Sequence, residues 1–386
     1  MNKKINLLIM PTDICNMNCV YCFHEAHHEN SGKMELKSLR RLYDITFKVY
    51  SDVTIIWHGG EPLVMGLDFY QKAFAMQKEY SATVRNRMQS NLTLLTDELA
   101  KFLCENNVGI GTSFDGVTNS STRGHSEEIL KGRERILKYH KSCGFIMVIS
   151  RKNIDNLIES YQLFKSLSAS FTINPYVSTD SSEDSSLRLS PLHTVMRLKE
   201  FFDYWIHDVT CCIHIDYFER IISFLISGEK TVCKYNSCLG KWAGIRYDGE
   251  ITPCNRYFPK QYSYGNIWDY DCLSSAFESI GFQNLLVDAI ARREKCKSCI
   301  AFPLCSGGCN NVALNENSVS ENGGDSCLIF QEIYQYIVES TISHARKLRN
   351  GASANLYNPI FVSILHRKHR SNIDFHYDVY HSPSAL

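Results

Sequence analysis

Short apolar runs alternate with longer amphipathic stretches along the first 176 residues of the chain. The expected strands cover residues 5–10, 53–57, 86–89, 109–112, 145–149 and 171–174, and residues 86–89 (Asn-Arg-Met-Gln) are the least apolar of them. Between them, apolar positions recur with helical spacing, as in residues 35–50 and 67–80. Strands that alternate with helices in this way predict right-handed βαβ units and a parallel sheet. We therefore expect an α/β fold for this part of the chain.

Polar or glycine-rich residues directly follow each of these expected strands. The second strand ends in the segment His58-Gly59-Gly60-Glu61-Pro62. In barrel-type α/β folds, the loops at the carboxyl ends of the strands form the active site. Turn formation alone explains the polar residues of each loop singly, but it does not explain why the first loop carries three thiols. We expect the loops to converge on one site that contains these thiols.

The first loop carries Cys15, Cys19 and Cys22 with the spacing C-x3-C-x2-C. Three thiolates from one loop can hold three corners of a 4Fe-4S cluster and leave the fourth iron without a protein ligand. That iron is open to a further ligand. The alternative is a zinc site in which His24 or His27 supplies the fourth ligand. The spacing favours the iron-sulfur interpretation.

Length and charge exclude several classes of protein. With 386 residues, the chain is long enough for one large α/β domain and a smaller second one. Lysine plus arginine and aspartate plus glutamate are equal at 41 each, so no overall charge favours nucleic acid or an anionic membrane. No apolar run approaches the roughly 20 residues of a membrane span, and the first run is too short for a signal peptide. We expect a soluble, cytoplasmic protein that binds neither nucleic acid nor membranes.

The chain has 16 cysteines. Because the cytosol keeps thiols reduced, clustered cysteine spacings indicate metal binding rather than disulfides. Cysteines scattered among apolar residues are instead expected to be small buried hydrophobes. The scattered ones are Cys104, Cys143, Cys211, Cys212 and Cys272.

The cysteine triad after the first strand, Tyr21 within it and the Gly59-Gly60-Glu61-Pro62 segment after the second strand together resemble the radical S-adenosylmethionine (SAM) enzymes. The resemblance implies a partial (β/α)6 TIM-type barrel in which SAM chelates the open iron through its amino and carboxylate groups. It also implies that Gly59, Gly60 and Glu61 hydrogen-bond the SAM amino group. Glycines allow a close backbone approach, and a carboxylate suits an ammonium group.

The same resemblance implies roles for four further residues. Ser113 would approach the SAM carboxylate, with Arg123 as a charge partner. Gln89 stands where peptide-modifying relatives contact the substrate backbone, and His58 stands where they often have glutamine. Each of the four is alternatively an ordinary polar residue whose hydrogen bonds stay within the protein.

A second cysteine region follows a polar run over residues 178–190, which predicts a loop, and helical patterns over residues 191–207 and 213–226. The pair Asp248-Gly249 predicts a tight β-hairpin that brings two of its thiols together. Eight thiols are enough for two fully ligated clusters, and a pair of zinc ribbons is the alternative. The eight are Cys233, Cys238, Cys254, Cys296, Cys299, Cys305, Cys309 and Cys327.

The order of these eight cysteines resembles the SPASM domain of radical SAM enzymes that modify peptides and proteins. The resemblance implies two auxiliary clusters, and hence three 4Fe-4S clusters in all. One auxiliary cluster would use Cys233, Cys238, Cys254 and Cys309, and the other Cys296, Cys299, Cys305 and Cys327. We expect a radical SAM domain over residues 1–228, a SPASM domain over 229–348 and a tail of unknown role over 349–386.

The motif spacing is most similar to that of the anaerobic sulfatase-maturating enzymes. In those enzymes an aspartate follows the cysteine at the place of Cys254 and is thought to take a proton from the substrate. This chain has Asn255 instead, and an amide cannot act as that base. We therefore favour a maturase of a ribosomal precursor peptide, with His58 as the candidate replacement base.

From the resemblance we expect the chain to generate a 5'-deoxyadenosyl radical from SAM and to remove hydrogen from a peptide side chain. The product would be a carbon-carbon (cyclophane-like) or thioether crosslink. Expected partners are the precursor peptide and a reductant such as flavodoxin or ferredoxin, while the oligomeric state is not predicted. Two alternatives stay open: sulfatase-type oxidation to formylglycine, and a non-enzymatic zinc or electron-transfer protein. The basic run at residues 366–370 is either a leader-peptide site or, more often, a solvated tail.

Overall fold

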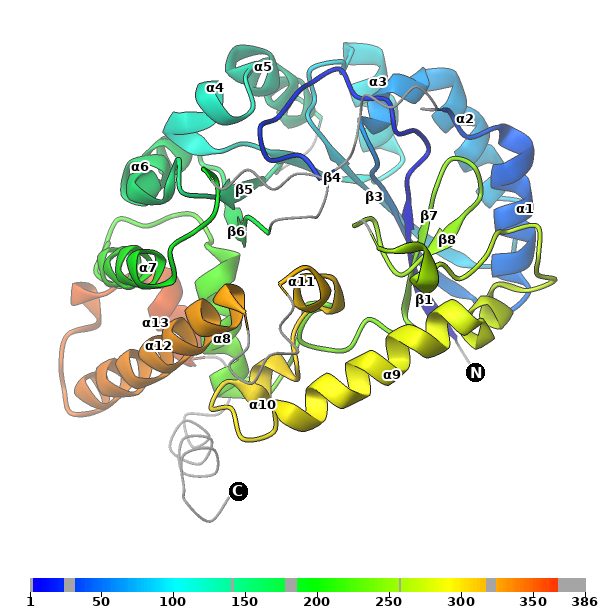
Figure 1. Ribbon diagram of the computed structural model, residues 1–386. Coiled ribbons are helices and arrows are strands. Elements are labelled where there is room, and N and C mark those ends of the chain that lie inside the picture. Colours follow the sequence, from blue (N-terminus) through cyan, green and yellow to red (C-terminus); the bar gives the residue numbers. More distant parts are fainter. Residues whose placement is uncertain are drawn as a thin grey trace. The chain divides into compact units, whose positions relative to one another are not determined.

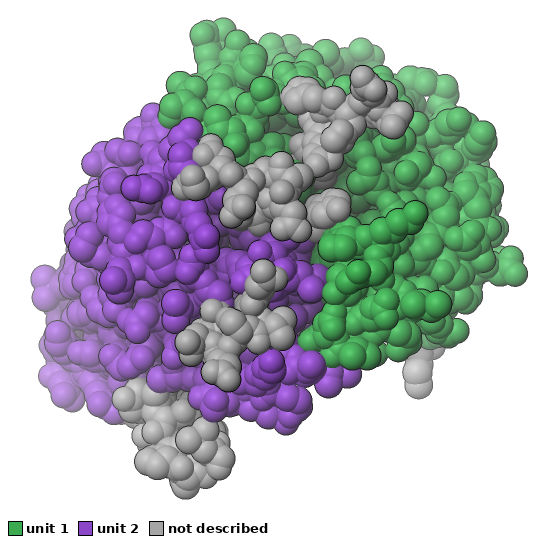
Figure 2. Space-filling view, viewed as in Figure 1, with its two compact units in different colours: residues 1–114, 119–144, 238–288 green, residues 115–118, 145–237, 289–386 purple. Residues whose placement is uncertain are grey.

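The computed structural model describes residues 3–23, 32–139, 142–177, 186–256, 258–316 and 324–366. The chain divides into two compact units, drawn in green and purple in Figure 2. Unit 1 comprises residues 1–114, 119–144 and 238–288, and unit 2 comprises residues 115–118, 145–237 and 289–386. Each unit combines segments of the expected radical SAM and SPASM regions, so the expected boundary at residue 228 stays a prediction.

The sheet of unit 1 has the strand order β4-β3-β2-β1-β7-β8 (Figure 1). Its strands are β1 (Lys4–Ile9), β2 (Asp52–Trp57), β3 (Thr83–Ser90), β4 (Gly109–Ser113), β7 (Trp242–Ile245) and β8 (Ile251–Thr252). Neighbours from β4 to β7 are parallel, and β8 runs antiparallel to β7. The β7–β8 pair confirms the hairpin expected at Asp248-Gly249. Because β7 pairs directly with β1, the hairpin extends the sheet that carries the cysteine triad.

The helices of unit 1 cover this sheet with their apolar faces. They are α1 (Leu36–Phe47), α2 (Gly66–Gln77), α3 (Asp97–Glu105), α4 (Asn119–Thr122) and α5 (Ser126–Leu137), together with 3-10 turns at Pro62–Met65, Lys260–Tyr262 and Leu273–Glu278. In Figure 1, α1, α2 and α3 lie along the outer side of the strands. The fully buried Trp57 of β2 packs edge-on against Tyr70 of α2 at 5.4 Å between ring centroids. Burial of these large rings from water stabilises the sheet–helix contact.

Unit 2 contains a parallel strand pair and a helical layer. The strands are β5 (Phe145–Ile149) and β6 (Phe171–Pro175), and the helices are α6 (Leu157–Ser166), α7 (Pro191–Ile206), α8 (Asp216–Ser227), α10 (Phe302–Cys305), α11 (Asn310–Asn315), α12 (Asp325–Arg349) and α13 (Pro359–His366). Short 3-10 turns lie at Gly116–Thr118, Ile154–Asn156 and Ala354–Leu356, and α9 (Ile280–Lys295) has residues in both units. Phe201, Phe202 and Phe218 form a buried aromatic core between α7 and α8.

All six expected strands are confirmed, and the largest difference concerns β3. This strand begins at Thr83, whereas the apolar pattern predicts a start at residue 86. The first part of β3 alternates exposed and partly exposed residues, including Arg85, which forms an ion pair with Asp52 on β2. A strand end that is paired by backbone hydrogen bonds but exposed to water carries no apolar signal.

Two further expectations concern the burial of the scattered cysteines and the absence of a membrane span. Cys143 and Cys211 are buried as expected, Cys104 and Cys272 are partly exposed, and the expectation is wrong for Cys212, which is exposed. Cys211 and Cys212 are neighbours in a loop, so only one of the two thiols faces the interior, where Cys211 donates to the Ile213 carbonyl oxygen at 3.3 Å. Among the described residues, no helix combines the length and apolar character that a membrane span requires.

Candidate active site

The triad loop lies against the glycine-rich segment that follows β2. The His58 N–H donates to the Ile9 carbonyl oxygen at 2.8 Å, where β1 ends. The Gly60 and Glu61 N–H groups donate to the carbonyl oxygens of Thr12 and Ile14, each at 2.9 Å. The backbone of residues 58–61 therefore continues the β1–β2 pairing beyond the strands. This places the glycine-glutamate motif directly beside the chain that leads to Cys15.

Gly59 and Gly60 are required by this close contact. A Cβ atom at Gly60 would lie 2.5 Å from the Ile14 carbonyl oxygen and 2.6 Å from that of Asp13. A Cβ at Gly59 would lie 2.5 Å from the Thr12 carbonyl oxygen, and the φ angle of Gly59 is +111°. Any side chain would push the triad loop away. The sequence explains these glycines by the approach of a ligand, whereas the structure shows that they also pack on the triad loop.

The Glu61 carboxylate is 1% exposed and is held by three hydrogen bonds. Oε1 accepts from the Ser90 hydroxyl at 2.7 Å and from the Leu63 N–H at 2.9 Å, and Oε2 accepts from the Asn91 N–H at 2.8 Å. Burial raises the pKa of Glu61, and the hydrogen bonds from Asn91, Leu63 and Ser90 lower it in part. A carboxylate has about four acceptor positions, so three contacts leave room for one more donor, such as an ammonium group.

The triad loop is also held by residues that the sequence analysis did not select. The Asn16 side chain donates to Thr93 Oγ1 at 2.7 Å and accepts from Asn91 Nδ2 at 3.0 Å. The Val20 N–H donates to the Thr122 carbonyl oxygen at 2.9 Å. The polar residues Asn91 and Thr93, directly after β3, are the signal that could have identified these supports. The loop is thus tied to the ends of β2 and β3 and to α4.

Two backbone N–H groups of the triad loop form short-range hydrogen bonds, one to a cysteine sulfur and one to a carbonyl oxygen. The Met17 N–H donates to Cys15 Sγ at 3.4 Å, and the Cys22 N–H donates to the Cys19 carbonyl oxygen at 3.1 Å. Burial raises the pKa of Cys15, the Met17 N–H lowers it, and the charges of Glu61 and Cys19 raise it further. Glu61, Cys15 and Cys19 therefore interact electrostatically. A cationic iron centre would relieve the repulsion between the thiolates.

The other residues expected to contact SAM, and Gln89, which is expected to contact the substrate, form two hydrogen-bonded pairs. Arg123 Nη1 donates to the Tyr21 hydroxyl at 2.8 Å, and its guanidinium carbon lies 5.8 Å from the centroid of the Tyr21 ring. Gln89 Nε2 donates to Ser113 Oγ at 3.0 Å across the carboxyl ends of β3 and β4. Both pairs lie within unit 1. The structure thus brings Arg123 to Tyr21 and Gln89 to Ser113, and their contacts with SAM or substrate stay a prediction.

The His58 ring acts as a hydrogen-bond acceptor in this structure. Its Nδ1 accepts from the Gly59 N–H at 2.9 Å, so the proton of the neutral ring lies on Nε2. Burial and the charge of Arg256 together lower the pKa of His58 to about 4, although the hydrogen bond from the Gly59 N–H raises it in part. This geometry argues against the expectation that His58 takes a proton from the substrate, because the nitrogen with a lone pair is already occupied.

The depressed pKa of His58 makes a prediction for stability. Unfolded histidine titrates near 6.5, so the unfolded state binds the extra proton as the pH falls from about 6.5 to about 4. The His58 contribution to the free energy of unfolding is therefore complete above pH 6.5 and is lost as the pH falls towards 4. His58→Gln should lose less stability between pH 7 and pH 5 than the unsubstituted protein, measured by anaerobic denaturant unfolding. Parallel loss in both proteins would contradict the assignment.

The second set of expected auxiliary ligands lies wholly in unit 2. Burial, together with the charges of Cys327, Cys299 and Cys296, raises the pKa of Cys305 to about 12. Cys327 is in turn affected by Cys296 and Cys299, and Cys296 by Cys299. All six pairs among these four thiols interact. This is the charge pattern of a site that holds cationic iron between four thiolates.

The first set is divided between the units. Cys238 and Cys254 lie in unit 1, where both raise the pKa of the buried Tyr264 hydroxyl after the larger effect of burial. Cys233 and Cys309 lie in unit 2, where both act on the Lys234 ammonium. Each unit thus brings two of these four thiols near one shared side chain. Asn255 follows Cys254, and the next residue, Arg256, donates its N–H to Cys254 Sγ at 3.4 Å.

No three or more His, Cys, Asp or Glu side chains in the described ranges lie close enough together to hold a single metal ion. A four-iron cluster takes one thiolate at each corner iron, so its ligands stand further apart than those of one ion. His24 and His27, the alternative zinc ligands, lie outside the described residues, as does the basic run except His366.

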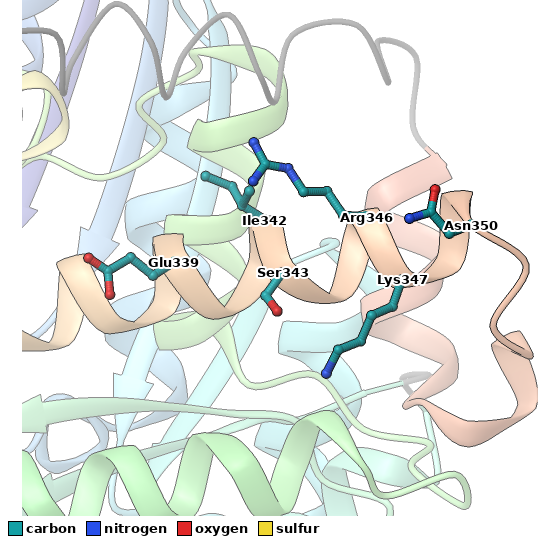
Figure 3. Close-up of a pocket in the computed structure, with 6 residues that line it drawn as sticks. All are labelled: Glu339, Ile342, Ser343, Arg346, Lys347 and Asn350. Carbon is teal, nitrogen blue, oxygen red and sulfur yellow. The ribbon is translucent and has the colours of Figure 1, made fainter.

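A surface pocket contains none of these candidate residues. It is lined by one helix, α12, and by the residue that follows it (Figure 3). The lining residues are Glu339, Ile342, Ser343, Arg346, Lys347 and Asn350. Since one helix alone provides these side chains, the pocket has no converging groups of the kind that catalysis needs.

Comparison with known proteins agrees with this site. Residues 9–164 match the model of the radical SAM superfamily, and this range includes the triad, the glycine-glutamate segment and Ser113. A cysteine-type anaerobic sulfatase-maturating enzyme of Clostridium novyi (strain NT) is 26% identical over 366 residues, which cover 88% of this chain and 96% of that enzyme.

Solved structures of two proteins share the fold. Native anSMEcpe with bound AdoMet has a TM-score of 0.79 at 24% identity and covers 89% of this chain and 100% of its own. Streptococcus suis SuiB bound to S-adenosylmethionine has a TM-score of 0.61 at 18% identity, and the match covers 83% of this chain and 75% of the SuiB chain. anSMEcpe has also been solved with the Cp18Cys peptide, and SuiB with the precursor peptide SuiA.

The α/β fold with its parallel sheet thus matches that of the anSMEcpe structures. The cysteine triad and the segment packed against it lie inside the matched range. We therefore identify residues 9–164 as a radical SAM domain.

Proposed function

We propose that this chain is a radical SAM peptide maturase with a SPASM-type region that holds two auxiliary clusters. The observation that carries the proposal is the contact between the triad loop and residues 58–61, through the Gly60 and Glu61 N–H groups. This contact places three thiols beside a buried carboxylate and two glycines. Such a site suits a 4Fe-4S cluster with one open iron and a ligand that carries an ammonium group.

The donor set fits both cofactors. Cys15, Cys19 and Cys22 would ligate three irons, and the remaining acceptor position of Glu61 would take the SAM amino group. Ser113 and Arg123 would approach the SAM carboxylate, with Tyr21 orienting the Arg123 guanidinium. The cluster and SAM, when bound, supply one-electron chemistry that removes hydrogen from a substrate. The protein contributes binding, orientation and exclusion of water.

Substrate contacts follow from the same edge of the sheet. Gln89 donates to Ser113, so an amide carbonyl oxygen at Gln89 remains as an acceptor for a backbone N–H of a bound peptide. The partly exposed Asn255, beside Cys254, would present an amide to the substrate instead of an acid. The two four-cysteine sets would hold auxiliary clusters that accept the surplus electron. Support for a peptide substrate comes from anSMEcpe and SuiB, both of which bind peptides.

Two products are compatible with this site. Asn255 favours a crosslink, because oxidation of one residue to an aldehyde needs a base that an amide cannot supply. The likeness to the Clostridium novyi sulfatase-maturating enzyme favours the second candidate, formation of formylglycine. A reductant such as flavodoxin or ferredoxin would serve either reaction.

Mass spectrometry after anaerobic incubation with SAM and dithionite distinguishes the two products. The probes are the Cp18Cys peptide and synthetic peptides translated from short reading frames beside the gene. We expect deoxyadenosine formation and a gene-neighbour peptide that loses two hydrogens without gaining an aldehyde that hydroxylamine can capture. A captured aldehyde on Cp18Cys would establish the sulfatase-type alternative. Absence of deoxyadenosine with every probe and without any probe would contradict the proposal.

A further inference from the structure

The hairpin that follows β7 contacts both ends of the triad loop. The loop leaves the β1 edge at Asp13 and returns at Gly32, and both of these residues lie in unit 1 with the hairpin. Arg246 Nη2 donates to Asp13 Oδ2 at 2.6 Å. A Cβ atom at Gly32 would lie 2.4 Å from Cε2 of the Tyr247 ring, so the ring packs directly on the Gly32 backbone. Two consecutive hairpin residues therefore hold the entry and the exit of the loop.

The two ends of the loop are also joined to each other. Thr12 Oγ1 donates to the Gly32 carbonyl oxygen at 2.7 Å, and Thr12 and Lys33 form an antiparallel bridge. The Met34 N–H donates to the Pro11 carbonyl oxygen at 2.7 Å. The base of the loop is thus a short ladder. Residues 58–61 hold this ladder from the β2 side, and the hairpin contacts it from the β7 side.

The Asp13–Arg246 ion pair is the charged contact between the hairpin and the base of the triad loop. The Asp13 side chain is 14% exposed and that of Arg246 is 35% exposed, so solvent screens the pair less than a surface ion pair. Arg246 also lies 3.6 Å from Glu250 across the hairpin, which fixes the guanidinium from a second side. The Tyr247 ring lies 6.0 Å from the Arg246 guanidinium carbon. Because Glu250 and the Tyr247 ring already hold the Arg246 guanidinium, the side chain loses little entropy when it pairs with Asp13.

The same hairpin carries ligands of the expected auxiliary site. Cys238 precedes β7 and Cys254 follows β8. The Arg246–Asp13 contact therefore connects the triad loop to the hairpin that carries Cys238 and Cys254. Asp13 is two residues from Cys15, and Arg246 is eight residues from each of these two cysteines.

We propose that Arg246 and Tyr247 are positioning residues that clasp the base of the triad loop and thereby tie SAM binding to the hairpin with Cys238 and Cys254. The proposal rests on the proposed function, since it assumes that SAM binds at the triad. Neither residue touches SAM or substrate. Their effect is to fix the triad loop in the place where its open iron faces the Glu61 side of the site.

A double-substitution cycle on the anaerobically reconstituted protein tests the charge contact. We expect Asp13→Asn and Arg246→Gln each to weaken SAM affinity about tenfold. The double variant should be no weaker than either single one, because both remove the same contact. Iron content should stay unchanged. Low-temperature electron paramagnetic resonance of the reduced protein should show a smaller fraction of the triad cluster shifting its signal on addition of SAM.

Two controls separate positioning from loss of folding. Arg85→Gln breaks an ion pair with Asp52 at the amino ends of β2 and β3, in which the acid is 12% exposed and the arginine 50% exposed, and should leave SAM affinity unchanged. Tyr247→Phe keeps the ring on Gly32 and should bind SAM normally, whereas Tyr247→Ala should not. Normal SAM affinity in both Asp13→Asn and Arg246→Gln, or additive losses in the double variant, would overturn the inference. An unsubstituted protein that carries no triad iron or binds no SAM would instead overturn the proposed function.

Discussion

Replacing any one of Cys15, Cys19 and Cys22 with alanine is expected to reduce deoxyadenosine formation to the level without enzyme. The physical reason is that a cluster held by two thiolates from one loop loses the ligand set that leaves a single iron open. Total iron should fall from about twelve to about eight per chain, because three four-iron clusters become two. The measurements are chromatography of deoxyadenosine and iron analysis after anaerobic purification.

Cys104→Ala is the matched control for this experiment. Cys104 belongs to the same unit but to helix α3, and it is only partly exposed. Iron content and deoxyadenosine formation should both be unchanged in this variant. Deoxyadenosine formation at the normal rate in all three triad variants would refute the assignment of the open iron to this loop.

The second large effect is expected at the set Cys296, Cys299, Cys305 and Cys327, which lies wholly in unit 2. Cys305→Ala should remove about four irons per chain and abolish peptide modification, while deoxyadenosine formation without peptide continues. Cys305 is the most strongly affected thiol of the set, since burial and the charges of three neighbouring thiols together raise its pKa to about 12. Loss of the cluster also removes binding energy that stabilises the fold around it.

Iron analysis, deoxyadenosine chromatography and thermal unfolding under anaerobic conditions test this second prediction. A lower unfolding temperature is expected for Cys305→Ala, and no change for Cys212→Ala, whose exposed thiol lies in the same unit. Full peptide modification by Cys305→Ala, with its iron content reduced, would show that this set is structural and takes no part in the reaction.

Much of the fold is local and can be predicted from the sequence. The six strands follow from short apolar runs, and the β7–β8 hairpin follows from Asp248-Gly249, because turn and strand preferences act over a few neighbouring residues. The start of β3 at Thr83 was missed, since the exposed end of a strand is polar. The eleven candidate cluster ligands come from spacing alone, and spacing is a property of the chain itself.

Other features depend on residues that are distant in sequence. The role of His58 as a base stays a prediction, and the hydrogen bond from the Gly59 N–H to Nδ1, which no sequence pattern reveals, argues against it. The triad loop is supported by hydrogen bonds between the Asn16 side chain and those of Asn91 and Thr93, which are 75 and 77 positions away. The contact of Arg246 with Asp13 spans 233 positions.

The amino-acid sequence by itself determined which thiols are grouped, approximately where the strands lie and which glycines follow the second of them. Only the tertiary structure decided that Gly59 and Gly60 lie against the carbonyl oxygens of the triad loop, and that β7 extends the sheet beside β1. The physical reason is that local preferences are set by steric and solvation effects between near neighbours. Contacts between remote segments are chosen by the packing of the whole unit, where burial and hydrogen bonding are satisfied together.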